Sequence, residues 1–424
     1  MPRALSAKTK SALVVVWLLA LGLYAPARLV TAQEIGATQD SAVDKGRYLV
    51  QVANCVSCHT AKDGTPFAGG QAFETTYRFL GDLYSSNITP DNETGLGSWT
   101  EDDFIRAMRL GVAPGGRHLF PAFPYTSFTK LATADLKAIY AYLRTLPAVH
   151  AVPPENSFWF RQRWVMVLWN ALFFRAGEFV PDPGKSDDWN RGHYLVEALG
   201  HCGACHTPRN LLLAERAADP LTGGVQIGEV EAGKNRTWSA PNLTSAQSGL
   251  AKWSADDLQK YLKTGNSRRA GVLGPMNEVI ANSLRYLTDA DAGALVSYIK
   301  SVPANKESPR QTLRADERDA GQALYDKHCE ECHLSTGRGG FRKAPPVAGS
   351  AIVQARDASS LVNVIVYGAR QAQGIPTAFD AWEDMSGFKD KMSDAEIAQL
   401  ANFLRANWGN RGGRVSPGSV AAQR

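Results

Sequence analysis

Apolar and polar positions along the chain predict a helical unit that recurs three times. Each unit opens with a helix that carries a glycine closely followed by an aromatic residue. Each closes with a helix that carries an aromatic, an aliphatic and a basic residue in succession, after a Thr or Ser followed by acidic residues, as suits a helix N-terminus. The opening segments are residues 46–50, 192–196 and 321–325, the closing triplets are residues 142–144, 298–300 and 403–405, and the predicted caps are Thr133, Thr288 and Ser393.

The recurring glycine predicts how the two helices of a unit meet. A glycine inside a helix costs about 1 kcal/mol relative to alanine. We therefore expect each one to let the aromatic residue of the closing helix cross the opening helix closely, since no Cβ separates the backbones. The sequence predicts a mostly α fold of three small domains in tandem, with extended loops in place of a true sheet.

The first 32 residues have the pattern of an export signal. Basic residues precede an apolar run over residues 12–24, and small residues follow at 30–32. This order predicts a secretory signal cleaved after Ala32. The run is short for a bilayer span, so an uncleaved anchor is the weaker alternative. We expect an exported, periplasmic protein.

Composition gives no support for nucleic acid as a partner once the signal is set aside. Of the 46 basic residues four lie in the first 32 positions, where no acidic residue occurs, so the formal charge falls from +5 to +1 on cleavage. The basic character of the chain therefore comes largely from the predicted signal. The 424 residues divide into a signal (1–32), three domains (33–150, 190–303 and 304–411), an aromatic-rich linker (151–189) and a polar tail expected to be disordered (412–424).

All six cysteines lie in three copies of the motif Cys-x-x-Cys-His. Two thiols at this spacing form thioether bonds to the vinyl groups of one haem, and the adjacent histidine becomes the proximal iron ligand. A thioredoxin-like pair needs one such motif in a βαβ setting, and a zinc ribbon needs no histidine after each pair. The motifs predict three covalent haems c, attached at Cys55, Cys58, Cys202, Cys205, Cys329 and Cys332, with iron bound by His59, His206 and His333.

The first two units share a further pattern that the third lacks. Asn-x-Thr at residues 87–89 precedes a tryptophan and a predicted cap at Thr100, and Asn-x-Thr at residues 242–244 precedes the same arrangement at Ser254. The first two units are therefore closer copies of each other. We interpret the pattern as a loop and helix start that cover one haem edge.

Methionine is the usual sixth ligand of an electron-transfer haem. In the second unit Met276 follows Gly-Pro in the loop before the closing helix. In the third, Met385 occupies the corresponding region, whereas Met392 abuts the closing helix and is expected in the core. We predict Met276 and Met385 as iron ligands.

The first unit has Phe123 where the methionine is expected, and phenylalanine cannot ligate iron. Two nearby side chains are the alternatives: Met108, which shares an apolar helix face with Phe104, and His118 in the same loop. An open or water-bound iron is the third alternative. His201 and His328 directly precede their motifs and are expected to be structural.

The linker is dense in aromatic residues over 158–174 and also carries basic ones. It is too interrupted to span a bilayer, but it suits a membrane surface or the border of a quinone site. The alternative, which we favour for most of these residues, is that they fill the groove between two haem domains.

These segments together resemble the three-haem cytochrome c subunits of bacterial periplasmic, membrane-bound dehydrogenases that act on alcohols, gluconate, sorbitol or fructose, and of some molybdenum hydroxylases. The resemblance covers essentially the whole mature chain. It is carried by residues 190–197 and 200–209, by the Gly-Pro-Met loop at 274–276 and by residues 407–410. Many members have Pro-Ala-Met-Pro-Tyr in the first domain, and this chain has Phe123 at that methionine.

The resemblance implies an electron conduit with no substrate-oxidising site of its own. A quinoprotein, flavoprotein or molybdenum subunit would oxidise an alcohol, sugar, aldehyde or N-heterocycle, and electrons would leave to ubiquinone or an oxidase at the inner membrane. The sequence has no nucleotide-binding glycine motif after a strand and no hydrolytic constellation. The alternatives are a free periplasmic electron shuttle and a multihaem peroxidase with an open first haem.

Overall fold

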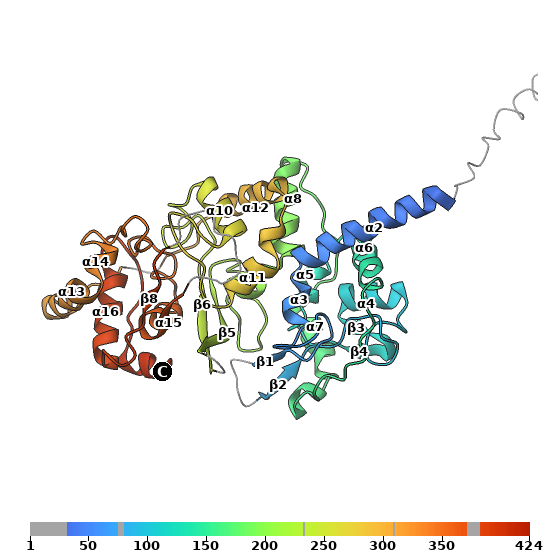
Figure 1. The fold of residues 1–424 in the computed structure, drawn as a ribbon, viewed down its shortest axis with the longest axis horizontal. Coiled ribbons are helices and arrows are strands. Elements are labelled where there is room, and N and C mark those ends of the chain that lie inside the picture. Colours follow the sequence, from blue (N-terminus) through green and yellow to red (C-terminus); the bar gives the residue numbers. More distant parts are fainter. Residues whose placement is uncertain (1–31, 75–79, 232–233, 308–309, 371–381) are drawn as a thin grey trace, which may run out of the picture. The chain divides into compact units, whose positions relative to one another are not determined.

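The computed structural model describes residues 32–74, 80–231, 234–307, 310–370 and 382–424 (Figure 1). The chain forms two units, residues 1–42 and residues 43–424. The predicted export signal lies outside the described residues except for Ala32, where a helix starts. The structure discussed below is that of the second unit.

This unit is mostly helical, as expected, and its elements follow the three sequence repeats. The first repeat holds α2 (Ala32–Val52), α3 (Cys55–Cys58), β1 (Ala72–Glu74), β2 (Asp82–Tyr84), α4 (Glu101–Leu110), β3 (Val112–Ala113), η2 (Pro114–Gly116), β4 (Arg117–His118), α5 (Tyr125–Phe128) and α6 (Thr133–Leu143). The linker holds η3 (Phe158–Arg161) and α7 (Val165–Phe173). The second repeat holds α8 (Asp187–Tyr194), η4 (Leu195–Leu199), α9 (Gly203–His206), β5 (Gly224–Glu231), β6 (Lys234–Ala240), α10 (Ala255–Thr264), α11 (Met276–Asn282), η5 (Leu284–Tyr286) and α12 (Asp289–Ser301). The third holds α13 (Ala315–His328), α14 (Glu330–His333), α15 (Ser359–Tyr367), β7 (Gly368–Ala369), β8 (Met385–Ser386), α16 (Asp394–Ala406) and α17 (Pro417–Ala421).

The opening and closing helices of each repeat cross at the predicted glycine. A Cβ on Gly192 of α8 would lie 1.9 Å from the Ala294 carbonyl oxygen of α12 and 2.8 Å from the Cβ of Tyr298. Gly46 and Gly321 make the same close approach to α6 and α16, against the Cβ atoms of Tyr142 at 2.8 Å and of Phe403 at 2.6 Å. The prediction that glycine permits the aromatic residue to cross is confirmed.

Four of the predicted helix caps are confirmed, and one is displaced. The hydroxyls of Thr100, Ser254, Thr288 and Ser393 each accept a hydrogen bond from the backbone N–H three residues later. The cap of α6 is Ala132 and not Thr133, which is the first helical residue. The Thr133 hydroxyl instead donates to Glu178 at 3.0 Å, a contact from the linker that the local sequence does not reveal.

The described residues form four two-stranded antiparallel sheets. One of them is a correction, because the sequence predicted extended loops in place of a true sheet. Strands β5 and β6 make a long hairpin, with Val225 opposite Ser239 and Ile227 opposite Thr237. The alternation of residues along these two segments is the pattern typical of a paired strand, and it lies outside the haem motifs.

Buried apolar residues form separate cores. The first two repeats share one continuous core that runs from Leu49 to Val302 in sequence, and the third repeat has its own. A small cluster of Phe120, Phe160 and Met166 connects the linker to the first repeat. The domain boundaries stay a prediction. The first and second repeats pack around one shared core.

Two expectations about the connecting segments are wrong. The linker does not bury most of its large residues, because Trp159, Trp164, Val167, Leu168, Leu172 and Phe173 are all exposed. The tail is not disordered, because it forms α17 and buries Val415 and Val420 against α15 and α16. Arg424 also donates to Asp394 and to two carbonyl oxygens. The polar composition of the tail did not indicate that these two valines anchor it to the core.

Candidate haem sites

The three Cys-x-x-Cys-His motifs each form a short helical turn directly after an opening helix. All six cysteines are half-buried free thiols. Burial raises the pKa of Cys55 and of Cys202 to about 12. A thioredoxin-like pair would have a thiol with a lowered pKa. Cys55 and Cys202 therefore lack the lowered pKa that distinguishes a thioredoxin-like pair.

The histidine of each motif is fixed in the same way. The Nδ1–H of His59 donates to the Ser86 carbonyl oxygen at 2.7 Å, that of His206 to the Pro241 carbonyl oxygen at 2.8 Å and that of His333 to the Pro345 carbonyl oxygen at 3.0 Å. Burial lowers the pKa of all three imidazoles and keeps them neutral. Such a bond fixes the tautomer and leaves Nε2 free to bind a metal. The residues present fit a haem iron at each motif.

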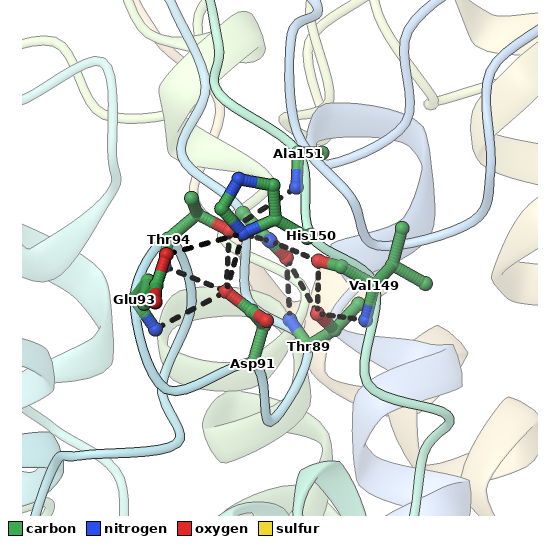
Figure 2. A network of polar contacts seen from close by, with 8 residues as sticks. Thr89, Asp91, Glu93, Thr94, Val149, His150 and Ala151 are labelled. Carbon is green, nitrogen blue, oxygen red and sulfur yellow. Dashed lines mark hydrogen bonds and ion pairs between the residues drawn. The ribbon is translucent and has the colours of Figure 1, made fainter.

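The carbonyl oxygen that holds His59 belongs to a loop fixed by the Asn-x-Thr pattern. The Asn87 Oδ1 accepts from the backbone N–H and hydroxyl of Thr89, and its Nδ2 donates to the Thr94 hydroxyl and to the Val149 carbonyl oxygen at 2.7 Å. Figure 2 shows how Thr89 and Val149 meet in this network, beside the Asp91 carboxylate. Asn87 is 2% exposed. The Asn-x-Thr pattern therefore does more than cover a haem edge. It holds in place Asn87, the residue directly after Ser86, whose carbonyl oxygen binds His59.

The second repeat uses the same device, and the third replaces it. Asn242 follows Pro241 directly, accepts from the Thr244 N–H and donates to the Asn305 side chain at 2.7 Å. The third repeat has Asn410 instead, which comes from beyond the closing helix and holds the loop after Pro345 through Val347 and Gly349. The Asn-x-Thr pattern is therefore absent from the third repeat, although Asn410 still holds the loop that follows Pro345.

The distal side of the second repeat is lined by buried polar atoms without a partner. Met276 begins α11, and Gly274 before it lies against the Trp238 ring, where a Cβ would be 2.6 Å away. Trp238 Nε1 and Asn277 Oδ1 are buried and unpaired in the described part of the chain. Buried polar groups are ordinarily satisfied. These atoms, next to the predicted ligand Met276, fit the polar edge of a haem, and the sequence motifs had not indicated Trp238.

In the third repeat the structure separates the two methionines. Met385 lies in β8, pairs with Ala369 and is half-buried at the edge of the core. Met392 is 5% exposed inside the core, as predicted. Of these two methionines, Met385 is the one whose side chain lies outside the buried core.

The distal side of the first repeat has the expected phenylalanine. Phe123 packs on Phe128 with ring centroids 5.6 Å apart. Met108 is 6% exposed in the shared core, as a packing residue would be. His118 lies in β4, and its Nδ1 is buried without a partner among the described residues. The structure therefore distinguishes a methionine already engaged in packing from an imidazole with a free nitrogen.

Comparison with known proteins agrees with this geometry. Residues 43–147 match the family described as cytochrome c, and residues 316–404 match the family described as cytochrome c oxidase, cbb3-type, subunit III. The cytochrome c subunit of the quinone alcohol dehydrogenase of Gluconobacter oxydans is 34% identical over 423 residues, which cover 96% of this chain and 86% of the relative. The chain belongs to the family of dehydrogenase cytochrome c subunits.

Two further relatives support this membership. The fructose dehydrogenase cytochrome subunit of Gluconobacter japonicus is 35% identical over 427 residues, 92% of this chain and 85% of the relative. A nicotinate dehydrogenase subunit of Pseudomonas putida is 40% identical over 394 residues, 89% of this chain but 31% of that longer protein. Cytochrome c domains carry covalently bound haem c with iron, and this dehydrogenase cytochrome subunit is an electron-transfer protein.

Proposed function

We propose that the chain carries three haems c, one at each motif, and passes electrons from a partner dehydrogenase to an acceptor. The observation that carries this proposal is the recurrence of one arrangement at three places: a half-buried neutral histidine whose Nδ1–H is bound to a loop carbonyl oxygen. Iron in a bound haem supplies the one-electron redox chemistry. The protein contributes the thiols, the axial ligands and the low-dielectric surroundings.

The haem count is tested by the mass of the intact holoprotein. We expect the mass of the mature chain plus three haems, and one haem fewer when both cysteines of one motif are replaced by serine. If the wild-type protein carries only two haems, the motif that binds none is the one whose cysteine replacement leaves the number of bound haems unchanged. The proposal would then be refuted for that motif.

We propose Met276 and Met385 as the sixth ligands of the second and third haems. For the first haem the alternatives are Met108, His118 and an open or water-bound iron, and the unpaired Nδ1 of His118 favours the histidine. Carbon monoxide binding to the reduced protein tests this proposal. A His118→Ala variant should bind one more equivalent than the wild type, and a Met108→Leu variant should bind no more; the opposite result would assign the methionine.

The electron donor that we propose is the catalytic subunit of a quinoprotein, flavoprotein or molybdenum dehydrogenase, because the relatives are named as subunits of alcohol, fructose and nicotinate dehydrogenases. The acceptor is ubiquinone or a terminal oxidase. Copurification from detergent-solubilised membranes tests the partnership. A cytochrome found alone in the periplasm would favour a free shuttle instead.

We propose further that the exported protein rests on the periplasmic face of the inner membrane through the linker. In the described part of the chain no helix is long and apolar enough to cross a bilayer. Helix α7 turns Met166 inward, where it is 7% exposed, and leaves Leu168, Leu172 and the preceding Trp164 exposed at 64%, 57% and 72%. An exposed apolar helix face beside a tryptophan suits a membrane interface. Replacement of Leu168 and Leu172 by serine should abolish flotation with phospholipid vesicles, and unchanged flotation would refute this attachment.

A further inference from the structure

Two tyrosines join the first and second repeats reciprocally. Tyr48 of α2 donates to Asp291 Oδ2 at 2.6 Å, in the first turn of α12 in the second repeat. Tyr194 of α8 donates to Asp135 Oδ2 at 2.5 Å, in the first turn of α6 in the first repeat. Each tyrosine therefore reaches from the opening helix of one repeat to the closing helix of the other.

Each aspartate is also bound to a basic residue of its own repeat. Asp291 accepts two hydrogen bonds from Arg191, at 2.8 and 2.7 Å, and Asp135 lies 2.6 Å from Lys45 Nζ. Asp135 and Asp291 are 6% and 8% exposed. Removal of one partner from a buried charge that is paired and hydrogen-bonded in this way is destabilising, because the charge is left uncompensated. We call the two contacts Tyr48–Asp291 and Tyr194–Asp135 the reciprocal Tyr–Asp pairs.

The same interface brings each haem motif against the distal segment of the other repeat. Asn282, in the helix that Met276 begins, donates to the hydroxyl of Ser57 inside the first motif at 2.9 Å. His201, next to the second motif, stacks edge-on against Phe128 in α5 with centroids 5.4 Å apart.

The third repeat is joined to the second in a different way. Ser360 and Asn363 of α15 bond to residues 237–239 of β6, and Arg236 donates to the Gln423 carbonyl oxygen. These contacts come from the hairpin and the tail and not from a haem motif. The reciprocal arrangement is therefore a property of the first two repeats.

We propose that the reciprocal Tyr–Asp pairs are positioning contacts that hold the haems at Cys55 and Cys202 as one electronically coupled pair. The inference rests on the proposed function only in requiring haems at these two motifs. Haems held by the motifs at Cys55 and Cys202 would supply one-electron exchange between them, in which the electron lost by one is gained by the other and no proton or ligand is transferred. Tyr48 and Tyr194 set the geometry between the motifs and do not themselves react.

The test uses the full-length holoprotein with Tyr48→Phe, Tyr194→Phe and the double variant. Tyr140→Phe and Tyr325→Phe are matched controls, because each of these hydroxyls donates at 2.6 Å to a carbonyl oxygen within its own repeat. Two readouts follow the haem pair: the exciton couplet of the Soret band in circular dichroism, and the rate of electron exchange between haems in the partly reduced protein. Thermal unfolding is followed in parallel.

We expect partial loss of the couplet in each single variant and its loss, with slower electron exchange, in the double variant. The controls should lose only stability, by the equivalent of one hydrogen bond. An unchanged couplet in a folded double variant, an equal loss in Tyr140→Phe, or a wild-type protein without a couplet would each overturn the proposal. If the double variant does not fold, the single variants decide the question by the same criteria. A wild-type couplet in a protein that accepts no electrons from a dehydrogenase would refute the proposed function and leave this inference intact.

Discussion

The imidazole of His59 donates a hydrogen bond of 2.7 Å to the carbonyl oxygen of Ser86. The bond connects the first motif to a loop that is held in place by the side chain of the next residue, Asn87. The bond increases the donor strength of the opposite ring nitrogen and so favours oxidised iron. A substitution that loosens this loop should therefore change the reduction potential of the haem at the first motif.

Replacement of Asn87 by alanine should raise the potential of a single haem. The change removes all four hydrogen bonds of the Asn87 side chain, two of them to the buried Thr89, and each buried partner left unsatisfied costs about 1–3 kcal/mol. We expect a rise of up to about 60 mV, the equivalent of a tenfold change in a one-electron equilibrium. Spectroscopic redox titration measures it, with the exposed Asn92→Ala in the same turn as the control. Equal shifts in both variants would contradict the role of Asn87.

Two glycine substitutions in the second repeat should have opposite effects on stability. Gly192→Ala places a Cβ 1.9 Å from a carbonyl oxygen and should destabilise the fold by about 1–3 kcal/mol or more. Gly293→Ala, on α12 with open space around the Cβ, should stabilise it by about 1 kcal/mol through helix propensity. Thermal unfolding of both variants decides, and equal melting temperatures would show that the crossing is not tight in solution.

Alanine at Met385 and at Met392 should separate ligation from packing. Met385→Ala should open the third haem to carbon monoxide and lower its potential, because the sulfur favours reduced iron. Met392→Ala removes a buried core side chain and should cost about 2–5 kcal/mol without a change in ligation. Carbon monoxide binding by Met392→Ala and not by Met385→Ala would reverse the assignment.

The stability of the joined first and second repeats should fall with acid in a way that depends on Glu197. Burial raises the pKa of this carboxyl, but hydrogen bonds from His193, Lys130 and Tyr298 outweigh it and hold the pKa well below its usual range. A carboxyl of this kind contributes stability that is present above its unfolded pKa of about 4.3 and is lost as the pH falls below it. Glu197→Gln should melt lower than the wild type at neutral pH, and the difference should shrink as the pH is lowered from about 6 to about 3. A difference that is constant with pH would contradict this account.

Local signals in the sequence were sufficient for much of the fold. The glycine of each opening helix and caps such as Thr288 lie within a few residues of the structure that they produce. The same holds for the placement of Phe123 where a methionine is expected. The cap at Thr133 was wrong because its hydroxyl is engaged by Glu178 across the linker, a contact that no local pattern encodes.

Long-range pairing accounts for what the sequence did not reveal. Tyr48 and Tyr194 were visible as repeated residues, but that each binds the other repeat depends on how two domains face each other. Trp238 became a candidate only when the β5–β6 hairpin brought its ring against Gly274. The exposed face of α7 was misjudged because aromatic density alone does not tell a groove from a surface.

The continuous core of the first two repeats has a consequence for how the protein comes apart. Because residues from Leu49 to Val302 belong to one cluster while the third repeat packs separately, unfolding should proceed in two cooperative stages and not in three. A fragment cut between the first and second repeats would expose half of a common interior. The smallest N-terminal fragment that we expect to fold alone therefore contains both the first and the second repeat.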